Sequence, residues 1–305
     1  MKLFVSSYAL ASPTEPWDRA AEGALFDGLA KLDLAGLELQ FTGRLHARDD
    51  AWLMAQLRPD WRFILTLLPG TMHRLKEDPR FGLASAEPDG RARALEFAET
   101  ARRAVERLNA HLGRKAVAAV SLHSAPRLGG GARSSLEGFA DSLTKLRGRD
   151  WSGAELLVEH CDAFAKNHAH DKGFLRLEDE CAAINVSSGA VPARVLINWG
   201  RSAVETRSAD GPLEHLRRAR QAGLLAGLFF SGATASDPDY GEWKDWHAPF
   251  STSCSNSILT PAAAKAALKE AGQVSYAGLK IQPLPRTLVT PERLAMIRAG
   301  LDALA

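Results

Sequence analysis

The fold is decided by a short run near the middle of the chain, Leu156-Leu157-Val158-Glu159-His160-Cys161-Asp162. The run begins as an apolar strand and ends on a carboxylate, a histidine and a second carboxylate. A second run is built in the same way, Val195-Leu196-Ile197-Asn198-Trp199-Gly200-Arg201. Polar residues at the carboxyl ends of successive strands are typical of a (β/α)8 barrel, in which they share one pocket. The pattern therefore predicts a barrel that carries its chemistry at these strand ends.

Short aliphatic runs recur along the whole chain with segments of helical period between them, which indicates βα units and a parallel sheet. The expected strands are Leu3 to Tyr8, Gly36 to Phe41, Phe63 to Leu68, Ala116 to His123, Glu155 to His160, Arg194 to Trp199, Leu224 to Phe230 and Tyr276 to Gln282. We expect an α/β fold, a (β/α)8 TIM barrel that occupies residues 1–305 as a single domain.

Helices and long loops are expected between these strands. Amphipathic patterns predict helices at Ala92 to Leu112 and Pro212 to Ala222, and Thr290-Pro291-Glu292 marks the start of the last helix. Long connections follow three strands, at Pro69 to Asp89, His123 to Ser135 and Ser231 to Ser257. Loops of this length on the carboxyl face of a barrel commonly bind ligands or catalyse. The triplet Gly129-Gly130-Gly131 is interpreted as a flexible lid.

Composition excludes several classes of protein. The chain has 305 residues, of which 46% are hydrophobic, and 38 Lys and Arg against 36 Asp and Glu give a formal net charge of +2. This balance predicts no attraction to nucleic acid or to an acidic membrane. Cys161, Cys181 and Cys254 show no CxxC spacing, so we expect reduced thiols and a cytoplasmic protein. No apolar stretch approaches the ~20 residues that span a bilayer.

The order of the pieces resembles the xylose isomerase-like barrel superfamily, which includes sugar isomerases, sugar epimerases and apurinic endonucleases. Gly36-Leu37-Glu38-Leu39 is similar to its second strand, and Glu159 resembles its fifth-strand metal glutamate. His123 stands where endonuclease relatives place a metal histidine, and Asp245-Trp246-His247 resembles the D-x-H segment of their loop. The resemblance implies an enzyme whose site lies at the barrel mouth, with Glu159 as the first candidate metal ligand.

The sixth and eighth strands depart from the superfamily pattern. Asn198-Trp199-Gly200-Arg201 replaces the usual D-x-x-H, and Lys280 or Gln282 replaces the usual glutamate. Two fixed cations would oppose a divalent ion, so no cofactor is assigned. A divalent metal stays an alternative, with the donors Glu159, His123, Asp245 and His247.

Two groups of site residues are expected. Glu159 is the predicted base, while His123, His247 and Lys280 supply the acid or stabilise an enediolate. Arg201 suits an anionic substituent, and tryptophan faces suit sugar rings. The expected substrate-binding residues are Arg201, Asn198, Trp199, Gln282, Glu38, Trp246 and Asp245.

Structural roles are open for several of these side chains. Glu159 could instead form a salt bridge to Arg201 or Lys280, and Arg201 could pair with Glu205, four residues further on. His160 points away from Glu159 in a regular strand, so we expect it to be packed rather than catalytic.

Three further polar residues lie near strand ends. Asp162 either turns to the side of Glu159 or caps the next helix. His46 and His73 are expected to be exposed.

The sequence thus predicts an enzyme that acts on a sugar, sugar acid or sugar phosphate by proton abstraction next to a carbonyl, an isomerase, an epimerase or a related lyase. The alternative is a non-catalytic barrel that binds a sugar-like anionic metabolite. A nuclease is disfavoured because most expected metal ligands are replaced and no basic surface is indicated. The expected partner is a small carbohydrate-like molecule, without nucleic acid or membrane, and homo-oligomerisation is left open.

Overall fold

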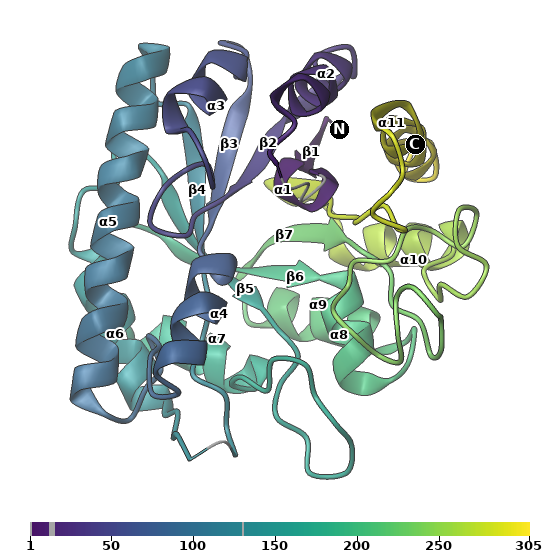
Figure 1. The fold of residues 1–305 in the computed structure, drawn as a ribbon. Helices are drawn as coiled ribbons and strands as arrows, with labels where there is room; N and C mark the ends of the chain where they lie inside the picture. The colour runs from purple at the N-terminus through teal and green to yellow at the C-terminus, as the bar shows by residue number, and fades with distance from the viewer. Residues whose placement is uncertain (1, 12–15, 130) are drawn as a thin grey trace.

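The computed structural model describes residues 2–11, 16–129 and 131–305, and they form a closed barrel of parallel strands in sequence order (Figure 1). Each strand pairs with the next along the chain, and β8 returns to β1, with Phe4 beside Gly278 and Val5 beside Leu279. The strands are β1 (Leu3–Ser6), β2 (Leu34–Gln40), β3 (Arg62–Thr66), β4 (Val117–Leu122), β5 (Glu155–His160), β6 (Ala193–Asn198), β7 (Leu225–Phe230) and β8 (Tyr276–Leu279). The predicted (β/α)8 barrel is confirmed.

Helices surround the barrel, with the long α5 along one side and α2 beside α11 near the chain ends (Figure 1). They are α1 (Ser7–Leu10), α2 (Arg19–Leu29), α3 (Asp50–Gln56), α4 (Leu68–Glu77), α5 (Pro88–Leu112), α6 (Leu136–Arg147), α7 (Leu177–Val186), α8 (Trp199–Thr206), α9 (Gly211–Gln221), α10 (Pro261–Ala271) and α11 (Thr290–Asp302). Within the described residues, none of these helices has both the length and the apolar character needed to cross a membrane.

Local sequence explains where the predicted helices begin and end. α5 has Pro88 in its first turn and ends at Gly113, whose φ of +66° is the left-handed conformation that suits glycine after a helix. α11 begins at Thr290 as expected, with Pro291 in its first turn.

Two loop predictions need comment. Pro69 to Asp89 was expected to be a loop, but α4 occupies Leu68–Glu77. Pro69 is compatible with this because the first turn of a helix does not need its missing N–H. Gly130, in the predicted glycine lid, lies outside the described residues.

The interior of the barrel is built in layers that place the site. Alternate residues along each strand point inward. One inward layer is apolar and consists of Phe4, Ile64, Ala119, Leu157, Leu196, Phe229 and Tyr276, joined by smaller side chains. Two residues further along the same strands, toward the carboxyl ends, the inward positions become polar, namely Ser6, Thr66, Ser121, Glu159, Asn198 and Ser231. The polar layer therefore lies directly on an apolar floor.

Candidate functional site

Buried ion pairs fill the centre of the barrel mouth. Lys280 follows β8, and its Nζ lies 2.8 Å from Glu38 Oε1 on β2 and 2.8 Å from Glu159 Oε1 on β5. The guanidinium of Arg201 on α8 lies 2.6 Å from Glu159 Oε1, through Nη1, and 2.9 Å from Asp245 Oδ2, through Nε. None of these five side chains is more than 2% exposed. Glu159 thus forms salt bridges to both Arg201 and Lys280, which is the structural role left open for it from the sequence.

Lys172, in the loop after β5, extends this network. Its Nζ lies 3.1 Å from Asp245 Oδ2 and 2.6 Å from Asp171 Oδ2. An isolated charge is costly to bury, whereas a paired and hydrogen-bonded one is tolerated. The network meets this condition by setting three buried carboxylates against three cations, namely Glu38, Glu159 and Asp245 against Lys280, Arg201 and Lys172.

The carboxylates differ in their affinity for protons. Burial alone would raise the pKa of Glu159, but the charges of Arg201 and Lys280 outweigh it and hold that pKa well below its usual range. Burial also acts to raise the pKa of Asp245, and the nearby cations reverse it in the same way. In Glu38, by contrast, burial prevails over the attraction of Lys280 and raises the pKa. Glu159 and Asp245 are therefore ionised at neutral pH, while Glu38 holds a proton more readily.

Two neutral imidazoles accompany these acids. His123 Nε2 lies 3.2 Å from Glu159 Oε2, and burial lowers the pKa of His123 to about 4. His247 Nδ1 lies 3.2 Å from Asp245 Oδ1, and burial lowers the pKa of His247 to about 3. Both rings are uncharged at neutral pH, so each can donate one hydrogen bond and accept another without adding a charge.

A cavity of about 380 Å³ opens at the mouth and has the size of a small-molecule site. Of the predicted site residues, it is lined by Asp245, His247 and Gln282. Tyr8 also lines it, and the centre of the Tyr8 ring lies 6.0 Å from Lys280 Nζ. Because Asp245 also belongs to the ion-pair network, the cavity borders the buried charges directly.

Three other predicted binding residues do not line this cavity. Trp199, the first residue of α8, is fully buried in the main hydrophobic core and does not line the cavity, unlike the substrate-binding residue that was expected. Trp246 is 43% exposed and does not line this cavity. Asn198 caps α8, since its Oδ1 accepts hydrogen bonds from the Arg201 N–H at 3.3 Å and from Ser231 Oγ at 2.8 Å.

Sequence reasoning missed several residues at the mouth. His46 was expected to be exposed, but it is only 7% exposed, lines the cavity, and has its ring 5.2 Å from those of Trp17 and Trp52. His73 is exposed as expected. Tyr8 follows the first strand, so the strand-end rule that selected Glu159 could have found it; no such signal marks His46.

Two structural alternatives are wrong. Arg201 does not pair with Glu205: its guanidinium contacts Glu159 and Asp245 instead, and Glu205 Oε2 lies 2.9 Å from His160 Nε2. Asp162 does not cap a helix; its Oδ2 accepts hydrogen bonds from the backbone N–H groups of Asp171 and Lys172 at 2.6 and 2.8 Å.

The sequence matches a protein family and a relative whose functions are not established. A family model described as a domain of unknown function, DUF4862, matches residues 4–296. An uncharacterized protein of Salmonella typhimurium is 34% identical over 273 residues, which cover 88% of this chain and 86% of that protein.

Two solved structures show the same fold. A xylose isomerase domain containing protein of Salmonella typhimurium matches with a TM-score of 0.62 at 10% identity, over 99% of this chain and 96% of the other. A 3-keto-D-glucoside 4-epimerase from E. coli matches with a TM-score of 0.55 at 14% identity, over 98% and 100%. At such low identity these matches establish the fold alone, a xylose isomerase-like TIM barrel, as the resemblance predicted.

Proposed function

The chain belongs to the DUF4862 family, and we propose that it is an isomerase or epimerase that removes a proton next to the carbonyl of a sugar, sugar acid or sugar phosphate. The supporting observation is the buried arrangement of Glu38, Lys280 and Glu159 next to a cavity at the carboxyl end of the barrel. Active sites of such barrels lie at this end. A sugar epimerase is among the structures with the same fold.

Fixed cations suit this chemistry. When a base removes the proton, the electron pair of the C–H bond moves toward the carbonyl oxygen, which becomes an enediolate oxyanion. Preorganised positive groups stabilise such a developing charge strongly in a water-poor site. Lys280 and Arg201 are positive groups of this kind, since both are fully buried and held by carboxylates.

The same cations fit a divalent metal poorly. The ammonium of Lys280 lies between Glu38 and Glu159, the two carboxylates that would bridge an ion, and the Arg201 guanidinium contacts Glu159 from another side. An ion placed there would meet two fixed positive charges. We therefore propose that the positive charge at this position comes from the chain itself, and we assign no step to a metal.

Glu159 is the proposed base. Its depressed pKa keeps it ionised, but its contacts with Lys280 and Arg201 weaken it as a base in the resting state. A substrate carbonyl that accepts a hydrogen bond from Lys280 would replace the Glu159 contact and free the carboxylate. The neutral ring of His123, 3.2 Å from Glu159 Oε2, is placed to pass the proton on.

The walls of the cavity favour a polar sugar. Arg48 and Arg286 line it together with Glu22 and Asp245, so the lining carries charged groups of both signs. Burial raises the pKa of the Tyr8 hydroxyl, which stays protonated and can donate to a sugar oxygen. Trp17 adds an aromatic wall that suits the apolar face of a sugar ring.

Exchange of substrate hydrogen with solvent tests the reaction directly. The protein is incubated in D2O with a panel of ketoses, aldoses, sugar acids and sugar phosphates. We expect deuterium to replace the hydrogen next to the carbonyl of the substrate, and proton NMR measures this exchange. Glu159→Gln should lower the exchange rate by about 10²-fold or more, since a positioned base contributes about that much. Lys280→Met should lower it similarly.

Glu155→Gln is the matched control, because Glu155 lies at the opposite end of the same strand and pairs with Arg194. The Glu155→Gln variant should exchange the substrate hydrogen with solvent at the wild-type rate. Full exchange by a folded Glu159→Gln variant would remove Glu159 as the base.

One observation favours the alternative, a non-catalytic barrel that binds an anionic sugar. The buried cations and carboxylates of the mouth already neutralise one another, as a purely structural network would. Saturable binding of a sugar without any deuterium exchange would support this reading against catalysis.

A further inference from the structure

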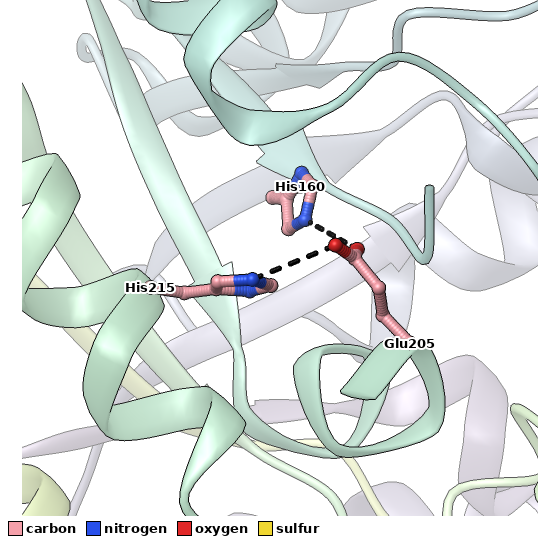
Figure 2. Close-up of side chains that lie close together, drawn as sticks. All are labelled: His160, Glu205 and His215. Carbon is pink, nitrogen blue, oxygen red and sulfur yellow. Dashed lines mark hydrogen bonds and ion pairs between the residues drawn. The ribbon is translucent and has the colours of Figure 1, made fainter. Parts of the chain in front are cut away.

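A second group of titratable side chains lies outside the barrel, on the opposite face of β5 from Glu159. His160 on β5, Glu205 on α8 and His215 on α9 point toward one another there (Figure 2). His160 Nε2 lies 2.9 Å from Glu205 Oε2, and His215 Nε2 lies 3.6 Å from Glu205 Oε1. One nitrogen or oxygen atom from each residue lies within 4.8 Å of the other two. The proposed sugar chemistry does not use this cluster.

We propose that His160, Glu205 and His215 bind a divalent transition-metal ion, with zinc as the first candidate. Two imidazoles and one carboxylate are common ligands of Zn²⁺, at distances of about 2.0–2.2 Å. Tetrahedral geometry then separates the ligand atoms by about 3.3 Å. The separations of 2.9 Å to Glu205 Oε2 and 3.6 Å to Glu205 Oε1 lie on either side of this value, and no two ligand atoms are more than 4.8 Å apart. Side-chain rotations that draw the two rings together would complete the coordination.

In each histidine, the ring nitrogen that would not bind the ion has a hydrogen-bond partner, as in known metal sites. His160 Nδ1 lies 2.7 Å from Glu180 Oε2, and His215 Nδ1 lies 2.9 Å from Ser202 Oγ. When the Nε2 proton of His160 is lost and Nδ1–H is still donated to Glu180, the lone pair of Nε2 becomes available to an ion. Metal-binding histidines usually have such a partner, which fixes the tautomer and the ring orientation.

Charge balance also favours an ion. The carboxyl groups of Glu180 and Glu205 both contact His160, and the single positive charge of a protonated His160 ring neutralises only one of them. Replacing the Nε2 proton of that ring with a divalent ion would put two positive charges beside the two carboxylates. The side chain of Glu205 is 18% exposed whereas that of His160 is fully buried, so Glu205 offers the route for entry and for a water as fourth ligand.

The position suggests a structural role. His160 directly follows Glu159 in the chain, and Glu205 lies one helical turn after Arg201 on α8. Glu205 also accepts a hydrogen bond from the Ala163 N–H at 2.8 Å. An ion here would fasten the end of β5 to α8 and α9, and so hold the two elements that bring Glu159 and Arg201 together.

Metal titration tests the site independently of the sugar reaction. Protein stripped with EDTA should bind one equivalent of Zn²⁺, with a rise of several degrees in Tm. Co²⁺ should give visible absorption bands of a low-symmetry site at the same stoichiometry. His215→Gln should abolish both responses, with folding checked by circular dichroism, and Glu205→Gln provides a second variant.

Glu159→Gln is the control, because it alters the barrel mouth and leaves all three ligands in place. It should bind Zn²⁺ like the wild type. Failure of the wild-type chain to bind Zn²⁺, or undiminished binding by both ligand variants, would overturn the proposal. Loss of binding in Glu159→Gln alone would place the ion in the barrel mouth and would also overturn it.

Discussion

His247 combines a buried imidazole with an uncommon backbone conformation. Its φ of +52° lies in the left-handed region, which asparagine adopts more readily than most residues. Its side chain is 9% exposed, and burial lowers its pKa to about 3 although Asp245 attracts the charged form. The folded chain therefore holds His247 neutral, whereas the unfolded chain protonates it near its ordinary pKa of about 6.5.

This difference predicts the pH dependence of stability. Between the two pKa values the unfolded state binds more protons, so the stability that His247 contributes is present above pH 6.5 and is lost as the pH falls toward 3. In His247→Asn this loss should disappear. Urea denaturation at pH 7.5 and pH 4.5 should show the wild type losing about 1–3 kcal/mol more than the variant.

The exposed His73 provides the control, since His73→Asn should follow the wild type at both pH values. A wild-type loss equal to that of His247→Asn would mean that His247 titrates normally in the folded chain.

How far single residues can be predicted depends on whether they still belong to a strand. Glu159 lies on β5, and its approach to Arg201 and Lys280 followed from strand ends that converge in a barrel. The alternation of side chains along a strand accounts for Trp199: Asn198 points into the barrel, so the next side chain is turned outward into the core. What one sequence does not reveal is that α8 begins at Trp199 and so places Arg201 beside Glu159.

Among the elements, β2 depends on a glycine at its point of contact with β3. Gly36 has a φ of +153°, and a Cβ atom there would lie 1.7 Å from the carbonyl oxygen of Arg62. The clash is with backbone, which cannot move without breaking the pairing of Gly36 with Arg62 in the sheet. The strand that carries Glu38 therefore needs glycine two residues before it.

Gly36→Ala should destabilise the fold by about 3 kcal/mol or more, because strain and a backbone clash add together. The matched control is Gly23→Ala in α2, where nothing lies within 4 Å of the new Cβ. That change should stabilise the chain by about 0.5–1 kcal/mol through helix propensity. Urea midpoints measure both variants, and equal effects of the same sign would refute the assigned role of Gly36.

Strands were easier to predict than the connections between them. The Glu155–His160 strand was predicted with its observed bounds because an aliphatic run between polar ends has few alternative structures. Pro69 and Gly70 are equally compatible with a turn and with the first turn of a helix, and α4 begins there directly after β3. Packing of α4 against the barrel decides between the two, and composition alone does not.

For the whole molecule, closure of the barrel depends on the seam between β1 and β8. Only two residue pairs are in register there, Phe4 with Gly278 and Val5 with Leu279, whereas five pairs join β2 to β3. A short ladder provides few backbone hydrogen bonds. The seam therefore needs support from outside the sheet, and α11 lies against both α2 and β8.

Arg293 on α11 provides that support, and its removal should open the seam selectively. It is 3% exposed and donates hydrogen bonds to the carbonyl oxygens of Leu10, Arg286 and Leu288, which join the chain after β1 to the chain after β8. Arg293→Ala should cost about 2–4 kcal/mol, since hydrogen bonds from a charged donor contribute about 1.5–3 kcal/mol each and do not add fully. Hydrogen exchange followed by mass spectrometry should show faster exchange of the amides of β1 and β8, with those of β5 and β6 unchanged. Arg298→Ala, at an exposed position on the same helix, should leave every strand protected. A uniform rise across all strands in Arg293→Ala would instead show that the barrel opens as one unit and that the seam has no separate stability.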